Sequence, residues 1–212
     1  MARRLILLRH GQTTYNATSR MQGQLDTELS EEGRQQARNI APVLTEMGVA
    51  KIVASDLSRA AVTAQIVAEH LELPVMYDAR LRETHLGQWQ GKTHAEVDGA
   101  DGSVRAHWRN TPTWAPPEGE SRIDVAQRAR PVVDELMEHF DGWDDAAVLL
   151  VAHGGTIAAL TSSLLDLEIS QYPMMKSLRN ANFAQLQALP RYGEPDTGVQ
   201  WYLEAWNQGL TV

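Results

Sequence analysis

Cysteine is absent from the 212 residues of this chain. Its absence excludes disulfide bonds, cysteine nucleophiles and cysteine-ligated zinc, and it is typical of proteins in a reducing compartment. A basic excess is missing too, since the formal net charge is −8. A general affinity for nucleic acid usually requires a basic face, so nucleic acid is not expected as a partner.

Long apolar runs and close metal-ligand spacings are also missing. No stretch approaches the roughly 20 apolar residues that cross a bilayer. The apolar run at 5–8 is too short for the core of a secretory signal, and the seven histidines contain no His-x-x-x-His pair. We therefore expect a cytoplasmic protein with no membrane partner and no metal ion.

What the chain does contain is an alternation of short apolar strands and amphipathic helices. Strands are predicted at about 4–9, 51–54, 75–77, 147–152, 183–189 and 199–205. Helices are predicted at about 30–48, from 58 onward, at 122–140 and at 156–165, with a kink or break at Pro42 and an irregularity at Pro131. This alternation predicts a three-layer α/β/α sandwich with a mostly parallel central sheet.

One segment, 82–117, does not follow the alternation. It contains Trp89, Trp108 and Trp114 together with several glycines and prolines. We interpret it as a small cap-like insertion, made of loops and short helices, within a single domain that spans residues 1–212.

Two predicted strands end in a histidine followed by glycine, in Arg9-His10-Gly11 and in His153-Gly154-Gly155. Open α/β sheets bind ligands at the carboxyl ends of their strands. A single histidine in such a place is more often structural, but a matched pair beside glycines favours a functional site. The glycines after His153 lead into a helix start, whose backbone amides favour an anion such as phosphate.

Two further charged side chains lie near strand ends. Arg59 falls in the first turn of the helix after the second strand, and Glu83 comes shortly after the third strand. Taken alone, Arg59 is equally consistent with a surface side chain paired with Asp56, and Glu83 with a solvated carboxylate. The order of all four motifs along the chain is more informative than any one of them.

In that order, the motifs resemble the histidine phosphatase superfamily, in its phosphoglycerate-mutase-like branch. The resemblance is carried by Arg9-His10-Gly11-x-Thr13-x-x-Asn16, Ser55-Asp56-Leu57-x-Arg59-Ala60, Leu81-x-Glu83 and His153-Gly154-Gly155. It extends over essentially the whole chain. It implies a phosphomonoester hydrolase that works through a phosphohistidine and requires no cofactor or metal.

The resemblance also implies a role for particular side chains. The implied catalytic residues are His10, Glu83, His153, Arg9 and Arg59, and Asn16 and Gln22 join Arg9, Arg59, Glu83 and His153 in binding the substrate. His10 is then the nucleophile, and Glu83 is the general acid and later the base for water. Two guanidiniums suit the charge on the equatorial oxygens of a transferring phosphoryl group, and they disfavour a cationic imidazole beside them.

The residues after Glu83 bear on the substrate. The pattern Leu86-Gly87-x-Trp89-x-Gly91 is typical of phosphatase members and favours hydrolysis, whereas Glu118 stands where the family's Gly-Gly-Glu-Ser motif has its first glycine. Arg82 and His85 are candidates for contacts with a substrate carboxylate. The blocks at 21–30, 81–91, 113–116 and 201–207 are similar to family members that dephosphorylate a sugar-acid phosphate, a resemblance that also implies a homodimer.

Other functions remain open on the same residues. A broad-specificity phosphatase and a phosphoglycerate mutase would use the same machinery. A non-catalytic protein that binds a phosphorylated ligand is a remote alternative, because the set of catalytic residues is complete.

Overall fold

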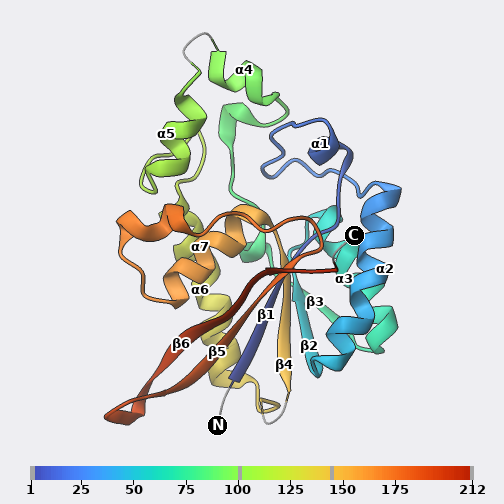
Figure 1. The fold of residues 1–212 in the computed structure, drawn as a ribbon, viewed down its shortest axis with the longest axis vertical. Helices are drawn as coiled ribbons and strands as arrows, with labels where there is room; N and C mark the ends of the chain where they lie inside the picture. The colour runs from blue at the N-terminus through green and yellow to red at the C-terminus, as the bar shows by residue number, and fades with distance from the viewer. Residues whose placement is uncertain (1–2, 100–101, 144–145, 211–212) are drawn as a thin grey trace.

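The computed structural model describes residues 3–99, 102–143 and 146–210. At its centre is a six-stranded sheet with the strand order β3-β2-β4-β1-β5-β6 (Figure 1). The strands are β1 (Arg3–Arg9), β2 (Val49–Ala54), β3 (Val75–Tyr77), β4 (Ala147–Ala152), β5 (Phe183–Arg191) and β6 (Glu194–Gln208). β3, β2, β4 and β1 are parallel to one another, which confirms the mostly parallel sheet. β5 is antiparallel to its neighbour β1, and β6 is antiparallel to β5.

Helices cover both faces of this sheet. The long ones are α2 (Glu31–Glu46), α3 (Ser58–Leu71), α6 (Arg122–His139) and α7 (Gly154–Leu164). Side chains alternate between the faces of a strand. Ile6 and Leu8 of β1 therefore join the core under α2 and α3, whereas Leu5 and Leu7 join the core under α6 and α7. The predicted three-layer sandwich is confirmed.

Several element ends differ from the sequence prediction. β6 is longer than 199–205, because its pairing with β5 extends beyond the apolar stretch. α7 begins at Gly154 rather than at 156, because His153 is the extended N-cap and the first helical amides need no partner within the helix. α2 continues through Pro42 without a break, since Pro42 is exposed and water can reach the carbonyl that proline leaves unpaired. α6 is likewise continuous through Pro131.

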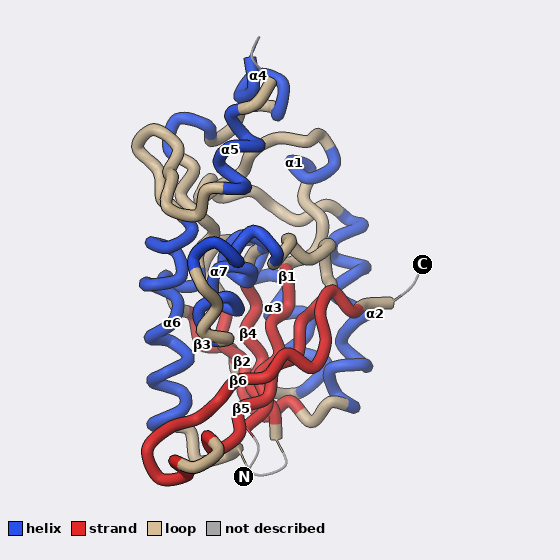
Figure 2. The backbone as a smooth tube through the Cα atoms, turned by 60° about the vertical axis from the view of Figure 1, so that its left-hand side comes forward, coloured by secondary structure: helices blue, strands red, loops and turns tan. Residues whose placement is uncertain are grey.

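The segment 82–117 lies beyond the carboxyl ends of the parallel strands, in both views (Figures 1 and 2). It contains η2 (Gly87–Trp89), α4 (His94–Asp98) and α5 (Val104–Asn110), and α1 (Thr14–Ala17) lies beside it. The ring of Trp89 packs against those of Trp108 and Trp114, with centroid distances of 5.7 and 5.5 Å. The tryptophans therefore form a small apolar core of this segment's own.

The other short helices of the described residues are η1 (Ala79–Leu81), before this segment, and η4 (Ile169–Met174), after α7. Within the described ranges, no helix has the length and apolar character that spanning a membrane requires.

Candidate active site

His10 lies at the end of β1 and is buried, with 2% of its surface exposed. Its Nδ1 atom is 2.7 Å from the carbonyl oxygen of Gly11. A carbonyl only accepts hydrogen bonds, so Nδ1 carries the hydrogen and Nε2 keeps its lone pair. Burial and the charges of Arg9 and Arg59 hold the pKa of His10 well below its ordinary value, although the Gly11 contact opposes them. His10 is therefore a neutral imidazole with a free Nε2.

His153 comes from the end of β4, the strand beside β1, and its side chain is fully buried. Its ring centroid is 5.1 Å from that of His10. The Nε2 atom lies 2.8 Å from the hydroxyl of Ser55, and the buried Nδ1 atom has no hydrogen-bond partner in the described structure. Burial and the charge of Arg59 hold the pKa of His153 well below its ordinary value. Ser55 thus orients this ring, a role that the sequence motif did not reveal.

Arg59, in the first turn of α3, is a fully buried cation. Its guanidinium donates to the carbonyl oxygens of Gly23 at 2.7 Å and Leu25 at 2.8 Å, which are neutral acceptors. Burial lowers the pKa of Arg59 to about 10, while the charges of Glu83 and Asp26 oppose the shift. No carboxylate pairs with it within the described residues, although buried charges are normally paired. Asp56, the alternative partner, instead binds Arg82.

Arg9 is a second cation without a carboxylate partner in the described structure, but it is half-buried. Its guanidinium donates to the carbonyl oxygen of Leu178 and, at 3.3 Å, to the hydroxyl of Ser177. Burial lowers the pKa of Arg9, and the charge of Glu83 opposes the shift. Two guanidiniums that are held by neutral oxygens, that of fully buried Arg59 and that of half-buried Arg9, form a strong site for an anion.

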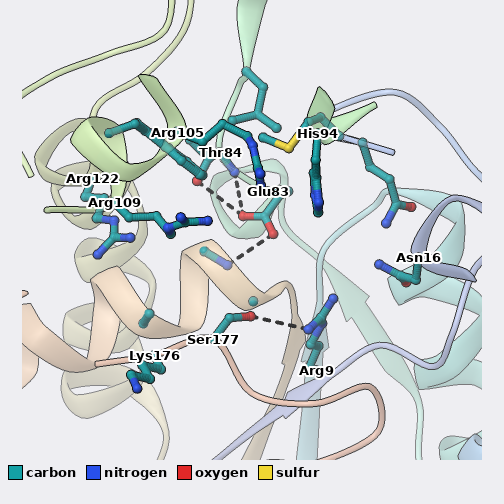
Figure 3. A pocket seen from close by; sticks show the side chains of 18 of the residues that line it. Arg9, Asn16, Glu83, Thr84, His94, Arg105, Arg109, Arg122, Lys176 and Ser177 are labelled. Atoms are coloured by element: carbon teal, nitrogen blue, oxygen red, sulfur yellow. Dashed lines mark hydrogen bonds between the residues drawn. The ribbon is translucent and has the colours of Figure 1, made fainter. Parts of the chain in front are cut away.

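Glu83 is held at the start of α7. Its carboxylate accepts a hydrogen bond from the backbone amide of Thr84 at 2.8 Å (Figure 3). It also accepts from the backbone amides of Gly155 at 3.1 Å and Thr156 at 3.2 Å. These helix-start amides were expected to face phosphate, and two of them hold Glu83 instead. A Cβ atom at position 155 would lie 2.5 Å from Glu83 Oε1, so the second glycine of the His-Gly-Gly motif makes room for the carboxylate.

Asn16 and Gln22 present their amide groups in a defined orientation. The Oδ1 atom of Asn16 accepts hydrogen bonds from the backbone amide and the hydroxyl of Thr13 and from the side-chain amide of Asn180. The Oε1 atom of Gln22 accepts hydrogen bonds from the hydroxyls of Thr13 and Thr27. Neither NH₂ group donates to another residue of the described structure, and both side chains line the cavity. Two amide donors are thus available to an anion.

These side chains meet in a cavity of about 510 Å³. Six of the seven predicted site residues line it, and His153 lies buried beneath it with its ring against that of His10. The structure also adds five cations that the sequence reasoning missed, and they are Arg20, Arg105, Arg109, Arg122 and Lys176. The only hint in the sequence was the two arginines near Trp108 in the inserted segment.

Two candidates for contacts with a substrate carboxylate, Arg82 and His85, are not among the residues that line the cavity. Arg82 does not line the cavity, because it forms a two-pronged ion pair with Asp56, with an Nε–Oδ1 distance of 2.7 Å. His85 is held by the carbonyl oxygen of Glu118 at 3.0 Å. Glu118 itself has a φ of 60°, a conformation that glycine adopts easily, which explains why the family motif has glycine there.

The comparisons with known proteins agree with this geometry. Residues 5–196 match the family model described as "Histidine phosphatase superfamily (branch 1)". The chain is 49% identical over 217 residues to a glucosyl-3-phosphoglycerate phosphatase of Mycolicibacterium vanbaalenii, with 99% of this chain and 96% of that protein covered. It is 33% identical over 181 residues to a probable phosphoglycerate mutase of Erwinia tasmaniensis, with 85% and 82% covered.

A solved structure of a mycobacterial glucosyl-3-phosphoglycerate phosphatase in complex with VO3 superposes with a TM-score of 0.91, at 50% identity, over 97% of this chain and 98% of that one. The phosphate complex of the same enzyme superposes with a TM-score of 0.89, at 48% identity, over 98% of both chains. Family, fold and residue pattern therefore agree, and the chain belongs to branch 1 of the histidine phosphatase superfamily.

Proposed function

We propose that this protein removes the phosphate of glucosyl-3-phosphoglycerate through a phosphohistidine at His10. The observation that carries the chemistry is the neutral imidazole of His10, whose free Nε2 lies beside the unpaired guanidiniums of Arg9 and Arg59. A nucleophile with a lone pair and two cations for the equatorial oxygens are what phosphoryl transfer needs.

In the first step, Nε2 of His10 attacks phosphorus, a P–N bond forms and the bond from phosphorus to the substrate oxygen breaks. The leaving oxygen takes its proton from the carboxyl group of Glu83. The buried Nδ1 of His153, with Nε2 oriented by Ser55, donates to a phosphoryl oxygen. In the second step, Glu83 takes a proton from water, the water oxygen attacks phosphorus, and the P–N bond breaks to release phosphate.

The shape of the cavity supports a substrate larger than phosphate. Beyond the arginines and histidines, its wall includes the apolar side chains of Met21, Leu86 and Trp108. Flat apolar surface of this kind suits the face of a sugar ring. The name of the enzyme at 49% identity supplies the particular ester.

Phosphoglycerate mutase is the second candidate, on account of the 33% identical relatives. A mutase must keep water from its phosphohistidine until the acceptor arrives. Arg109 and Lys176 line the cavity and are exposed to solvent, so its mouth is open to water. This openness favours hydrolysis.

The proposed assembly is a cytoplasmic homodimer. The resemblance over 201–207 supports it, and this stretch lies in β6, an edge strand with exposed Tyr202 and Leu203. Sedimentation at several concentrations tests it, and a monomer throughout would contradict it.

A substrate panel tests the proposed reaction. We expect kcat/KM to be highest for glucosyl-3-phosphoglycerate, lower for 3-phosphoglycerate and lower again for p-nitrophenyl phosphate. Equal values for all three would instead indicate a broad-specificity phosphatase, and no turnover of any would indicate a binding protein.

A further inference from the structure

Arg109, Arg122 and Lys176 line the cavity, and within the described residues their side chains have neither an acidic partner nor a hydrogen bond. Arg20 also lines the cavity without an acidic partner, but it donates to the carbonyl oxygen of Gly91 at 3.0 Å. Their neighbour Arg105 is different, because it pairs with Asp98 at 2.6 Å. Among the residues that the structure describes, Glu83 is the only acidic one that lines the cavity. In a chain with 27 acidic and 19 basic residues, three unpaired cations on one wall call for an explanation.

The three side chains reach the cavity from separate parts of the fold. Arg109 lies near the end of α5, Arg122 is the first residue of α6, and Lys176 follows η4. All three lie on one side of Glu83, whereas Arg9 and Asn16 lie on the other side (Figure 3). This wall therefore lies across Glu83 from Arg9, one of the two guanidiniums that we assign to the phosphate.

Arg122 is the least solvated of the three. Its guanidinium lies over the ring of Trp108, 5.8 Å from the ring centroid, and its side chain makes no hydrogen bond within the described structure. Burial and the nearby charge of Arg109 lower the pKa of Arg122, and the charge of Glu83 opposes them. A half-buried guanidinium beside another cation is most easily stabilised by an anion.

We propose that Arg122, with Arg109 and Lys176, forms a second anion subsite that binds the carboxylate of a phosphorylated hydroxy acid. The inference rests on the proposed function, since the glycerate part of that substrate carries a carboxylate as well as the phosphate ester. The planar guanidinium of Arg122 matches a carboxylate with two parallel hydrogen bonds. Arg109 and Lys176 are exposed, so their contribution is screened and smaller.

A matched pair of substrates isolates this subsite. 3-Phosphoglycerate and the glycerol phosphate of the same configuration differ only in a carboxylate against a hydroxymethyl group. Arg122→Gln should lower kcat/KM for 3-phosphoglycerate by about 10- to 100-fold, the range for losing a hydrogen bond to a charged group, mainly through KM. It should change kcat/KM for glycerol phosphate far less. Arg122→Lys should restore part of the loss, and Lys176→Ala should cause a smaller one.

Arg38→Gln is the matched control for net charge, because Arg38 is an exposed residue of α2 that pairs with Glu31 outside the cavity. It should leave both substrates unaffected. Equal losses on both substrates in Arg122→Gln, or no loss on either, would overturn the subsite.

A binding measurement separates this inference from the proposed function. In a His10→Ala background, calorimetry gives Kd for both ligands without turnover. Arg122→Gln should weaken binding of 3-phosphoglycerate by a similar factor and spare glycerol phosphate. If this selectivity holds while the wild-type enzyme shows no preference for glucosyl-3-phosphoglycerate, then the substrate proposal fails and the subsite stands. Equal Kd changes for the two ligands would refute the subsite even if the substrate panel succeeds.

Discussion

Gly155→Ala should damage the acid step while leaving the nucleophile in place. The new Cβ would lie 2.5 Å from Glu83 Oε1, whereas ordinary contact begins at 3.4 Å. The carboxylate must therefore move by about 1 Å, and a misplacement of that size costs on the order of 100-fold in rate. The three atoms nearest to the added methyl group belong to Glu83 and Thr84, and none belongs to His10 or Arg59.

The expected signature depends on the leaving group. An alkyl ester such as 3-phosphoglycerate needs a proton on its leaving oxygen, whereas p-nitrophenolate leaves without one. Gly155→Ala should therefore lower kcat about 100-fold on the alkyl ester and much less on the aryl ester. Glu83→Gln should produce the same split. Alanine is favoured over glycine within a helix by about 1 kcal/mol. This preference offsets part of the stability lost with the hydrogen bonds to Glu83, so thermal unfolding should show that the variant is folded.

A double-mutant cycle decides whether the methyl group acts through Glu83. If it does, the Gly155→Ala change should cost little more once Glu83 is already Gln, because both changes remove the same proton transfer. Losses that multiply in the double variant, or an equal loss on alkyl and aryl esters in the single variant, would refute this reasoning.

Three further outcomes are expected. His10→Ala should abolish turnover but leave the protein folded, as checked by kcat and circular dichroism, and retained activity would remove the proposed nucleophile. Orthovanadate should raise Tm, because at 100 times its Kd binding stabilises the folded protein by about 2.7 kcal/mol. Arg59→Ala should lose most of this increase in Tm, because the buried cation is gone. An unchanged increase in the variant would place the anion elsewhere. The free energy of unfolding should fall as pH drops below about 6.5, the ordinary pKa of histidine, because His10 and His153 stay neutral in the folded protein and take up protons only when unfolded. Each contributes up to about 1.4 kcal/mol per pH unit, so urea titrations of His10→Ala between pH 7.5 and 5.5 should show a shallower decline, and an unchanged slope would contradict the assignment.

Much of the site was predictable because its parts are local. Arg9 and His10 end an apolar strand, and His153 ends the strand that pairs with it, so the parallel register brings the two rings together. β1 is buried from Leu5 to Leu8 and β4 is buried throughout, as expected for parallel strands that helices cover on both faces. The family match confirms the predicted histidine phosphatase, whereas the roles of individual residues remain predictions.

Other features depended on long-range partners. Asp56 was considered for Arg59, but it pairs with Arg82, which is 26 residues away, and this pairing leaves Arg59 without an acid and removes Arg82 from the cavity. Proximity along the chain favours Arg59, which is only three residues from Asp56, so the pairing with Arg82 depends on the fold. The choice comes from burial, since Arg59 points into the site and Arg82 is partly exposed.

The amino-acid sequence by itself determined the sandwich, the strand-end histidines and the motifs that contain Arg9 and Arg59, because apolar periodicity and short motifs act over a few residues. Only the tertiary structure decided that Glu83 takes the amides at the start of α7, and that Arg109, Arg122 and Lys176 share one wall of the cavity. Those residues come from separate elements, and they meet only because packing of the inserted segment and of α6 over the strand ends brings their side chains to the same edge of the sheet.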